Sequence, residues 1–323
     1  MITKEEVILA YRLILGREPE NNDVVKNYCH TVHSVQDLRA EFIKSPEFVE
    51  KMAKALDSPQ FVRQRHPFNL PKIPVEVQVT EEVLDQMFGR IADAWEYMGF
   101  TEPYWSVLTQ PQYKVDEFAK NSEQFYESSG PLFRNIIASL KRNGINCTEI
   151  DTCLEVGCGV GRMTGYLAET FKNVTAADVS SQHLVKAKNY LDAQNFNNVK
   201  LVHWQNLKQL ADLANLDLVI SVITLQHNPP PVMAWMLEKL LNALKSKGIA
   251  FIQIPTYRNG YMFEASRYLH STAEKKIEMH FLPQSSIYNI IDLANCKCLE
   301  VREDSMVGDE DKMLSNSFLI QKK

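Results

Sequence analysis

The sequence predicts an α/β fold, in which an open parallel sheet carries helices on both faces and further helices precede it. An apolar lead-in runs into glycines at every second position, Gly157, Gly159 and Gly161, and a helical pattern follows directly. A second strand, 174–178, ends on an acid. The run 216–221 is almost continuously apolar, as expected of a parallel strand that is buried on both faces.

Composition limits the class of protein and its partners. The 323 residues are 45% hydrophobic and 23% charged, which allows one substantial core and a smaller domain. A net charge of −5 without a basic block argues against nucleic acid or an anionic membrane surface as the main partner. We find no apolar run of ~18 residues and no signal peptide, so we expect no membrane span and a cytoplasmic location. The six cysteines form no C-x-x-C pair, and we expect buried thiols in a reducing cytosol and no metal site.

Residues 1–56 are predicted to be a small helical module. Thr3-x-x-Glu6 is a capping box, and Ser45-Pro46 reads as an N-cap followed by proline at the first helical position. The stretches 13–19 and 42–48 resemble a short helical domain of unknown function that recurs beside enzymes of bacterial surface-glycan pathways. The resemblance implies a docking or oligomerisation role, with another copy of the chain or a partner protein.

The remaining chain divides by composition and periodicity. Four prolines in 57–79 predict an extended linker, and 80–148 a helical cap rich in aromatic residues. Residues 149–323 carry the predicted sheet, with an aromatic-rich insertion at about 256–282 that we expect to form a lid. Its predicted strands are 152–157, 174–178, 199–203, 216–221, 248–255, 299–306 and 317–321.

The spacing of the glycines indicates which ligand binds at the end of the first predicted strand. A dinucleotide fingerprint needs glycine at its sixth position, where Arg162 stands. The pattern Glu155-x-Gly157-x-Gly159-x-Gly161 instead resembles motif I of the class I S-adenosylmethionine-dependent methyltransferases, which have a Rossmann-like sheet. The resemblance implies S-adenosylmethionine as cofactor and S-adenosylhomocysteine as product. The cofactor contacts that it implies are Glu155, Gly157, Cys158, Gly159, Gly161, Asp178, Val179, Gln205, Asn206, Leu207 and Val222.

Two of these positions can also be argued from residue chemistry. Asp178 lies at the end of the second strand, about 20 residues past the first glycine, where a carboxylate can accept from both ribose hydroxyls. A helix N-cap is the alternative role for this acid. Past the third strand, Gln205 or Asn206 would accept from the adenine amino group while Leu207 packs on the ring. A plain turn is the alternative there.

His227 is the best candidate for a general base, and His280 is the second. His227 follows the fourth strand at its carboxyl end, where open sheets bind ligands, and an ordinary pKa near 6.5 suits proton removal at neutral pH. A loop-ordering role is the alternative. His280 belongs to the insertion that we expect over the pocket mouth.

The acceptor site is predicted from aromatic and polar residues of the cap and lid. We expect at least one of Tyr104, Trp105, Tyr113 and Tyr126 to line the pocket, with packing of helix against helix as the alternative. Tyr257 and Arg258 of the insertion are further candidates for holding a polar acceptor, unless they form a solvated lid face.

The sequence as a whole favours methyl transfer to a small molecule or glycan precursor, specifically O-methylation of a sugar hydroxyl in glycan biosynthesis. Methylation of a carboxylate or amine on another metabolite is a second enzymatic hypothesis. A scaffold that binds cofactor without catalysis is a third, which the intact glycines and Asp178 disfavour. Asn228-Pro229-Pro230 is similar to a motif of amide and base N-methyltransferases, but it stands too far past its strand and lacks the closing aromatic.

Overall fold

A computed structural model describes residues 2–56, 71–304, 306–308 and 313–323. The chain forms two compact units, Met1–Pro67 and Phe68–Lys323, and each is described here by itself. Of the predicted linker at 57–79, residues 57–70 lie outside the described part of the chain.

The N-terminal unit is helical. Its helices are α1 (Lys4–Leu15), α2 (Asn22–Thr31), α3 (Val35–Lys44) and α4 (Pro46–Leu56). The Thr3 hydroxyl accepts from the Glu6 amide at 3.2 Å, and the Glu6 carboxylate accepts from the Thr3 amide at 2.8 Å. This reciprocal capping box starts α1 as the sequence predicts. The core closes around Tyr11, whose ring meets the Phe42 ring edge to face at 4.8 Å.

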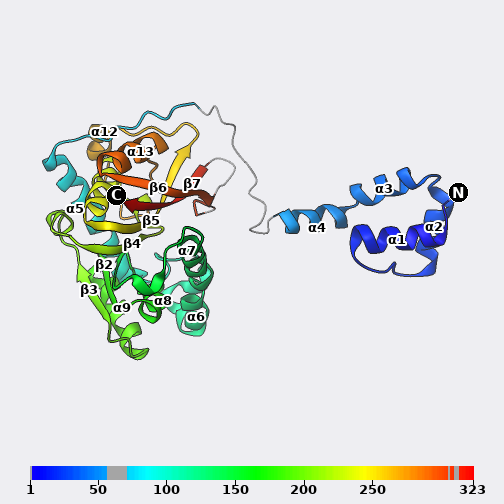
Figure 1. The fold of residues 1–323 in the computed structure, drawn as a ribbon, viewed down its shortest axis with the longest axis horizontal. Helices are drawn as coiled ribbons and strands as arrows, with labels where there is room; N and C mark the ends of the chain where they lie inside the picture. The colour runs from blue at the N-terminus through cyan, green and yellow to red at the C-terminus, as the bar shows by residue number, and fades with distance from the viewer. Residues whose placement is uncertain (1, 57–70, 305, 309–312) are drawn as a thin grey trace. The chain divides into compact units, whose positions relative to one another are not determined.

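The larger unit is built on a seven-stranded sheet of order β3-β2-β1-β4-β5-β7-β6 (Figure 1). Its strands are β1 (Thr152–Val156), β2 (Asn173–Asp178), β3 (Val199–His203), β4 (Leu216–Ser221), β5 (Leu244–Arg258), β6 (Cys296–Asp304) and β7 (Met313–Lys322). The first five are parallel, and β7 is antiparallel to β5 and β6. The order reverses between β1 and β4, and a crevice at such a switch point binds ligands in open α/β sheets. The predicted Rossmann-like sheet is confirmed.

Helices cover both faces, as predicted. One face packs against α5 (Glu81–Thr101), α10 (Lys208–Ala211), α11 (Pro230–Asn242) and α13 (Gln284–Leu293). The other packs against α7 (Gly130–Arg142), α8 (Thr164–Thr170) and α9 (Ser181–Ala193). The remaining elements are η1 (Pro111–Tyr113), α6 (Val115–Glu127), η2 (Cys147–Glu149), η3 (Leu225–His227) and α12 (Ala265–His270). Strand β5 runs on to Arg258 because Tyr257 and Arg258 still pair with β7, so the insertion begins later than expected.

Helix α5 ties distant parts of this unit together. Its Arg90 guanidinium donates to the carbonyls of Tyr268, Ser271 and Thr272 in the insertion, at 2.8 to 3.1 Å. In Figure 1 this helix lies beside α12, although the two are far apart in sequence. Near its other end, the Glu96 carboxylate accepts from the Ser181 amide at 2.7 Å, at the start of α9. The helix therefore fixes the insertion and the β2–α9 turn relative to one another.

Gly99 permits the close approach of α5 to α9. A Cβ at this position would overlap Ser180 and His183, whereas a Cβ at Gly89 on the same helix would meet nothing within 4 Å. We expect Gly99→Ala to lower the free energy of unfolding by about 1–3 kcal/mol through overpacking. Gly89→Ala is the matched control and should raise it by roughly 0.5–1 kcal/mol, because alanine favours the helix. Urea denaturation measures both, and equal shifts in the two variants would contradict this account of the packing.

Candidate functional site

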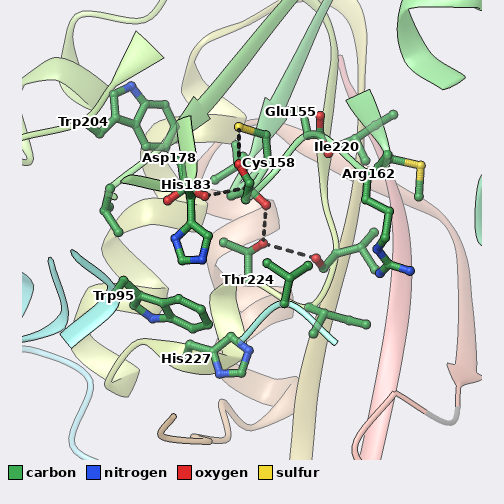
Figure 2. Close-up of a pocket in the computed structure, with 18 of the residues that line it drawn as sticks. Trp95, Glu155, Cys158, Arg162, Asp178, His183, Trp204, Ile220, Thr224 and His227 are labelled. Carbon is green, nitrogen blue, oxygen red and sulfur yellow. Dashed lines mark hydrogen bonds between the residues drawn. The ribbon is translucent and has the colours of Figure 1, made fainter. Parts of the chain in front are cut away.

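A cavity lies at the switch point, outside the carboxyl ends of β1, β2 and β4 (Figure 2). The cap contributes Ile91, Trp95, Ser106, Val107 and Leu132 to its lining. The glycine loop and the strand ends contribute Glu155, Val156, Gly157, Cys158, Gly159, Arg162, Met163, Asp178, Val179, Trp204, Ile220, Val222, Ile223 and Thr224. His183, His227, Asn228 and Met236 complete it. The cavity is therefore mostly apolar, with two acids, one arginine and two histidines.

The glycines of the loop are required by backbone shape and by close neighbours. Gly157, Gly159 and Gly161 have φ of +76°, +53° and +85°, the left-handed region that side chains rarely adopt. A Cβ at Gly157 would also overlap the Thr224 side chain, and a Cβ at Gly159 would stand 3.0 Å from Val107. The loop thus leaves its backbone open toward the cavity.

Asp178 holds this loop in place. One carboxylate oxygen accepts from the Gly159 amide at 2.8 Å, and the other accepts from the Ser180 amide at 2.9 Å. The second contact resembles the N-cap alternative, but the first crosses from β2 to the β1 loop. Because each carboxylate oxygen can accept more than one hydrogen bond, both remain able to accept from ligand hydroxyls. Asp178 is buried and lines the cavity.

Glu155 is a buried acid at the end of β1. Its carboxylate accepts from the Thr164 hydroxyl at 2.6 Å. Burial, with a smaller contribution from the negative charge of Asp178, raises its pKa to about 7. A cationic ligand group beside it would favour the ionised form.

Trp95 stands between the two histidines of the cavity (Figure 2). Its ring centroid lies 5.1 Å from the His227 ring and 5.9 Å from the His183 ring. The His183 Nε2 contacts the Ser106 hydroxyl at 2.9 Å, and its Nδ1 is buried with no hydrogen-bond partner among the described residues. This wall offers an aromatic face flanked by two imidazoles.

Hydrogen bonding assigns a tautomer to His227. Its Nδ1 lies 2.7 Å from the Glu278 carbonyl oxygen, which can only accept, so Nδ1 carries the proton and Nε2 is free of one in the neutral ring. Burial lowers the pKa of His227 to about 4, and the ring is neutral at pH 7. The contact between His227 and Glu278 also joins the insertion to the loop after β4.

The backbone of that loop is strained at Ile223. This residue has φ +55°, which is unfavourable for a β-branched side chain and costs about 1–3 kcal/mol. The Gln253 side-chain oxygen accepts from the Ile223 amide at 2.7 Å. Gln253 in turn donates to Gln226 at 3.1 Å and to Ser315 at 2.7 Å, all buried. A buried amide thus holds the cavity wall in an unfavourable conformation.

Several residues that were expected to contact the cofactor do not line this cavity. Gln205 and Asn206 are exposed, and the Gln209 side chain accepts from both of their amides, which matches the plain-turn alternative. Leu207 is buried in the core, and the neighbouring Trp204 lines the cavity instead. Gly161 does not line the cavity: it packs against α9, where a Cβ would stand 3.3 Å from the Ala187 Cβ.

The structure also separates His280 and the lid candidates from this cavity. His280 contacts the Tyr261 hydroxyl at 2.9 Å and the Glu278 carboxylate at 3.1 Å. It lines a second hollow under the insertion, together with the exposed Arg258. Tyr257 is buried in β5. None of these three residues lines the cavity at the switch point.

The cap aromatics pack helix against helix. Tyr104 stacks on Phe118 at 3.3 Å, and Tyr126 stacks on Tyr190 at 3.6 Å. Tyr113 is buried against Phe125. Trp105 is half-buried and does not line the cavity, although the two residues after it do.

Sequence reasoning did not identify Trp95, Thr224, His183 and Arg162, which also line the cavity. In the sequence, Trp95 belongs to the predicted helical cap and Thr224 follows the fourth predicted strand, and neither position carries a motif of its own. No local signal marks His183, because α9 begins with an ordinary serine cap.

The lining suits S-adenosylmethionine by the chemistry of its donors. Carboxylates can accept from ribose hydroxyls and an ammonium group, an arginine can bind a carboxylate, and apolar walls can hold an adenine ring and a thioether. The glycine loop supplies the open backbone between them. These residues therefore fit the cofactor that the sequence resemblance implies.

Comparison with known proteins finds similarity to methyltransferases. Residues 153–248 match the family described as a methyltransferase domain. Magnesium protoporphyrin IX methyltransferase of Synechocystis PCC 6803, solved with bound S-adenosylmethionine, is 16% identical with a TM-score of 0.51, over 76% of this chain and 100% of that chain. The same enzyme with bound S-adenosylhomocysteine is 17% identical with a TM-score of 0.50, over 72% of this chain and 98% of that chain. A methyltransferase of Clostridium acetobutylicum ATCC 824 is 17% identical with a TM-score of 0.45, over 59% of this chain and 90% of that chain. No curated protein matches the chain.

The chain is an enzyme, a methyltransferase, and its cofactor is S-adenosylmethionine. Within the described residues, no cluster of three or more histidines, cysteines or acids could hold a metal ion. In that same part of the chain, no helix is both long and apolar enough to span a bilayer.

Asp178→Ala should weaken binding of S-adenosylhomocysteine more than tenfold, or about 1.4 kcal/mol. The substitution removes the ligand acceptor and also frees the Gly159 amide from its partner. Titration calorimetry measures the affinity, and the product is the better probe because it cannot turn over. Unchanged affinity in a folded variant would remove Asp178 from the cofactor site.

Glu155→Gln should stabilise the ligand-free protein at pH 8 but not at pH 5. The folded pKa of about 7 lies above the ordinary 4.5, so ionisation of Glu155 opposes folding increasingly as pH rises between these values. The gain in unfolding free energy at pH 8 is at most roughly 3 kcal/mol. Urea denaturation at the two pH values tests this, and an equal gain at both would show that ionisation is not the cause.

Proposed function

We propose that the chain transfers a methyl group from S-adenosylmethionine to a hydroxyl of a small molecule or glycan precursor, specifically a sugar hydroxyl. The observation that carries the proposal is the pairing of Trp95 with the neutral His227 at the carboxyl end of β4. An aromatic face suits the apolar side of a sugar ring, and a neutral imidazole nitrogen can take a hydroxyl proton. The resemblance of residues 1–56 to a module found beside surface-glycan enzymes supports the same acceptor class.

When bound, S-adenosylmethionine supplies a methyl group that its sulfonium has already activated. The chain then has to position the acceptor, exclude water and receive one proton. His227 would accept the hydroxyl proton on Nε2 as the bond to the methyl group forms. The Glu278 carbonyl keeps Nδ1 protonated and thereby keeps Nε2 available. The cap helix α5 would cover the acceptor through Trp95, and Arg90 anchors the insertion beside it.

Methylation of a carboxylate or an amine is the second candidate, and it needs no strong base. The chemistry of the product separates the three cases. We would incubate the enzyme with methyl-labelled S-adenosylmethionine and panels of free and nucleotide-activated sugars, carboxylic acids and amines. A labelled product that survives mild alkali and carries no added basic nitrogen is an ether. An alkali-labile product is an ester and would overturn the proposal, as would an N-methyl product.

His227→Asn should lower kcat on a hydroxyl acceptor about 10²–10⁴-fold. Asparagine can still donate to the Glu278 carbonyl but has no nitrogen in the place of Nε2, so it separates a base from a loop-ordering residue. His227→Ala removes both functions and should be no more active. Near-wild-type turnover in His227→Asn alone would assign the histidine to loop order.

The pH profile gives an independent check on the same residue. Because the pKa of His227 is about 4, its base form is fully present above that value and is lost as pH falls through it. The His227-dependent part of kcat/KM should therefore be flat between pH 6 and 9. A loss of that part centred near pH 6.5 would contradict the buried, neutral state described above.

A further inference from the structure

Glu278 makes contacts through both its backbone and its side chain. Its carbonyl oxygen accepts from Nδ1 of His227 at 2.7 Å. One carboxylate oxygen accepts from the Tyr268 hydroxyl at 2.9 Å and lies 3.1 Å from Nε2 of His280. The other carboxylate oxygen lies 3.7 Å from the guanidinium of Arg90. This residue of the insertion therefore contacts the cavity histidine through its backbone and three other side chains through its carboxylate.

The carboxylate of Glu278 is ionised in this cluster. Burial opposes its negative charge, but hydrogen bonds from His280 and Tyr268 and the positive charge of Arg90 outweigh burial and lower its pKa. Arg90 is itself mostly buried, with its guanidinium carbon 4.3 Å from the centroid of the Tyr268 ring. The Nε of Arg90 is buried without a hydrogen-bond partner among the described residues. Removal of the carboxylate would therefore leave a buried cation without this opposite charge, which is destabilising.

His280 adds a second contact between the insertion and the loop that carries His227. Its amide donates to the Gln226 carbonyl at 2.8 Å. Its side chain is buried, and its Nδ1 lies 2.9 Å from the Tyr261 hydroxyl. Because an ionised carboxylate can only accept, the neutral ring of His280 carries its proton on Nε2, toward Glu278. The carboxylate thus holds a side chain whose own backbone binds the residue next to His227.

We propose that Glu278 is a positioning residue for His227, because its carboxylate holds in place the carbonyl that orients the imidazole. The inference rests on the proposed role of His227 as the base. Only the tautomer with the proton on Nδ1 can both donate to this carbonyl and accept a hydroxyl proton on Nε2. If the carbonyl moves, the ring can also carry its proton on Nε2, and that form cannot act as the base. The contacts around Glu278 therefore set the fraction of the enzyme in which the base is available.

The same cluster connects His227 to helix α5 by a second route. The direct route is Trp95, whose ring centroid lies 5.1 Å from that of His227. The indirect route runs from Arg90 through the carboxylate of Glu278 to its carbonyl. The place of the imidazole and its tautomer therefore both depend on this helix.

Nitrogen-15 NMR of histidine-labelled protein at pH 7 tests the inference without an acceptor. Two-bond correlations distinguish an imidazole protonated on Nδ1 from one protonated on Nε2, and the His227 signals are those missing from His227→Asn. We expect one Nδ1-protonated form in the wild-type protein and a mixture of both tautomers in Glu278→Gln. Glu274→Gln is the matched control, because it removes an exposed acid of the insertion that pairs with Lys276. It should leave the His227 signals unchanged.

A double-mutant cycle is the functional test, on the hydroxyl acceptor that the labelled panel identifies. We expect Glu278→Gln to lower kcat about tenfold or more. The KM for S-adenosylmethionine should change less than about twofold, because the substitution lies outside the cofactor cavity. In the His227→Asn background the same substitution should lower kcat less than about twofold, because no base remains to be positioned. An equal loss in both backgrounds would assign Glu278 to the stability of the fold alone.

The outcomes separate this inference from the proposed function. A single Nδ1 tautomer in Glu278→Gln together with wild-type kcat would overturn the positioning role and leave His227 as the base. Near-wild-type turnover in His227→Asn would overturn both. If Glu278→Gln does not fold, Tyr268→Phe removes one hydrogen bond to the carboxylate and keeps the ring beside Arg90. This variant should show a smaller fraction of the second tautomer, and a spectrum identical to that of the wild-type protein would refute the inference.

Discussion

The site depends on one carboxylate that bridges two strands. Asp178 stands at the end of β2 and accepts from an amide of the β1 loop and from an amide at the start of α9. The loop has three left-handed glycines, and this bridge, together with the buried side chains of Cys158 and Val160, gives it a defined shape. The same carboxylate keeps further lone pairs for a ligand. The order of the loop and the capacity to accept from a ligand are thus properties of one side chain.

The helical cap supplies the part of the cavity lining that the sheet does not. Helix α5 reaches the insertion through Arg90, the β2–α9 turn through Glu96 and the cavity through Trp95. Gly99 lets it approach closely enough for these contacts. Because one rigid helix makes all three, a shift at the insertion would be felt at the aromatic wall of the cavity. The aromatic side of the cavity is therefore set by tertiary packing more than by the sheet.

This division explains what could be predicted from sequence. The sheet, its strand ends and the glycine loop follow from local periodicity and spacing, which is why Glu155, Gly157 and Asp178 were found in the cavity. Past β3 the same reasoning pointed to residues 205–207, but a tight turn carries no periodicity, and Trp204 faces the cavity instead. Tyr104 and Tyr126 stack on partners that sequence cannot identify, because those contacts join separate helices.

The left-handed Ile223 sets a limit on how this enzyme can be made more robust. Substitution by glycine would relieve the backbone at that position, so a search guided by thermal resistance alone would select it. With glycine at position 223, the hydrogen bond to the Gln253 side-chain oxygen would no longer be required to hold this backbone conformation. The loop between β4 and His227 would then sample several conformations. A more heat-resistant variant with a substitution at position 223 would therefore hold His227 less firmly in place. Evolution toward heat tolerance in such a fold is therefore expected to act away from the end of β4, where rigidity and activity do not oppose each other.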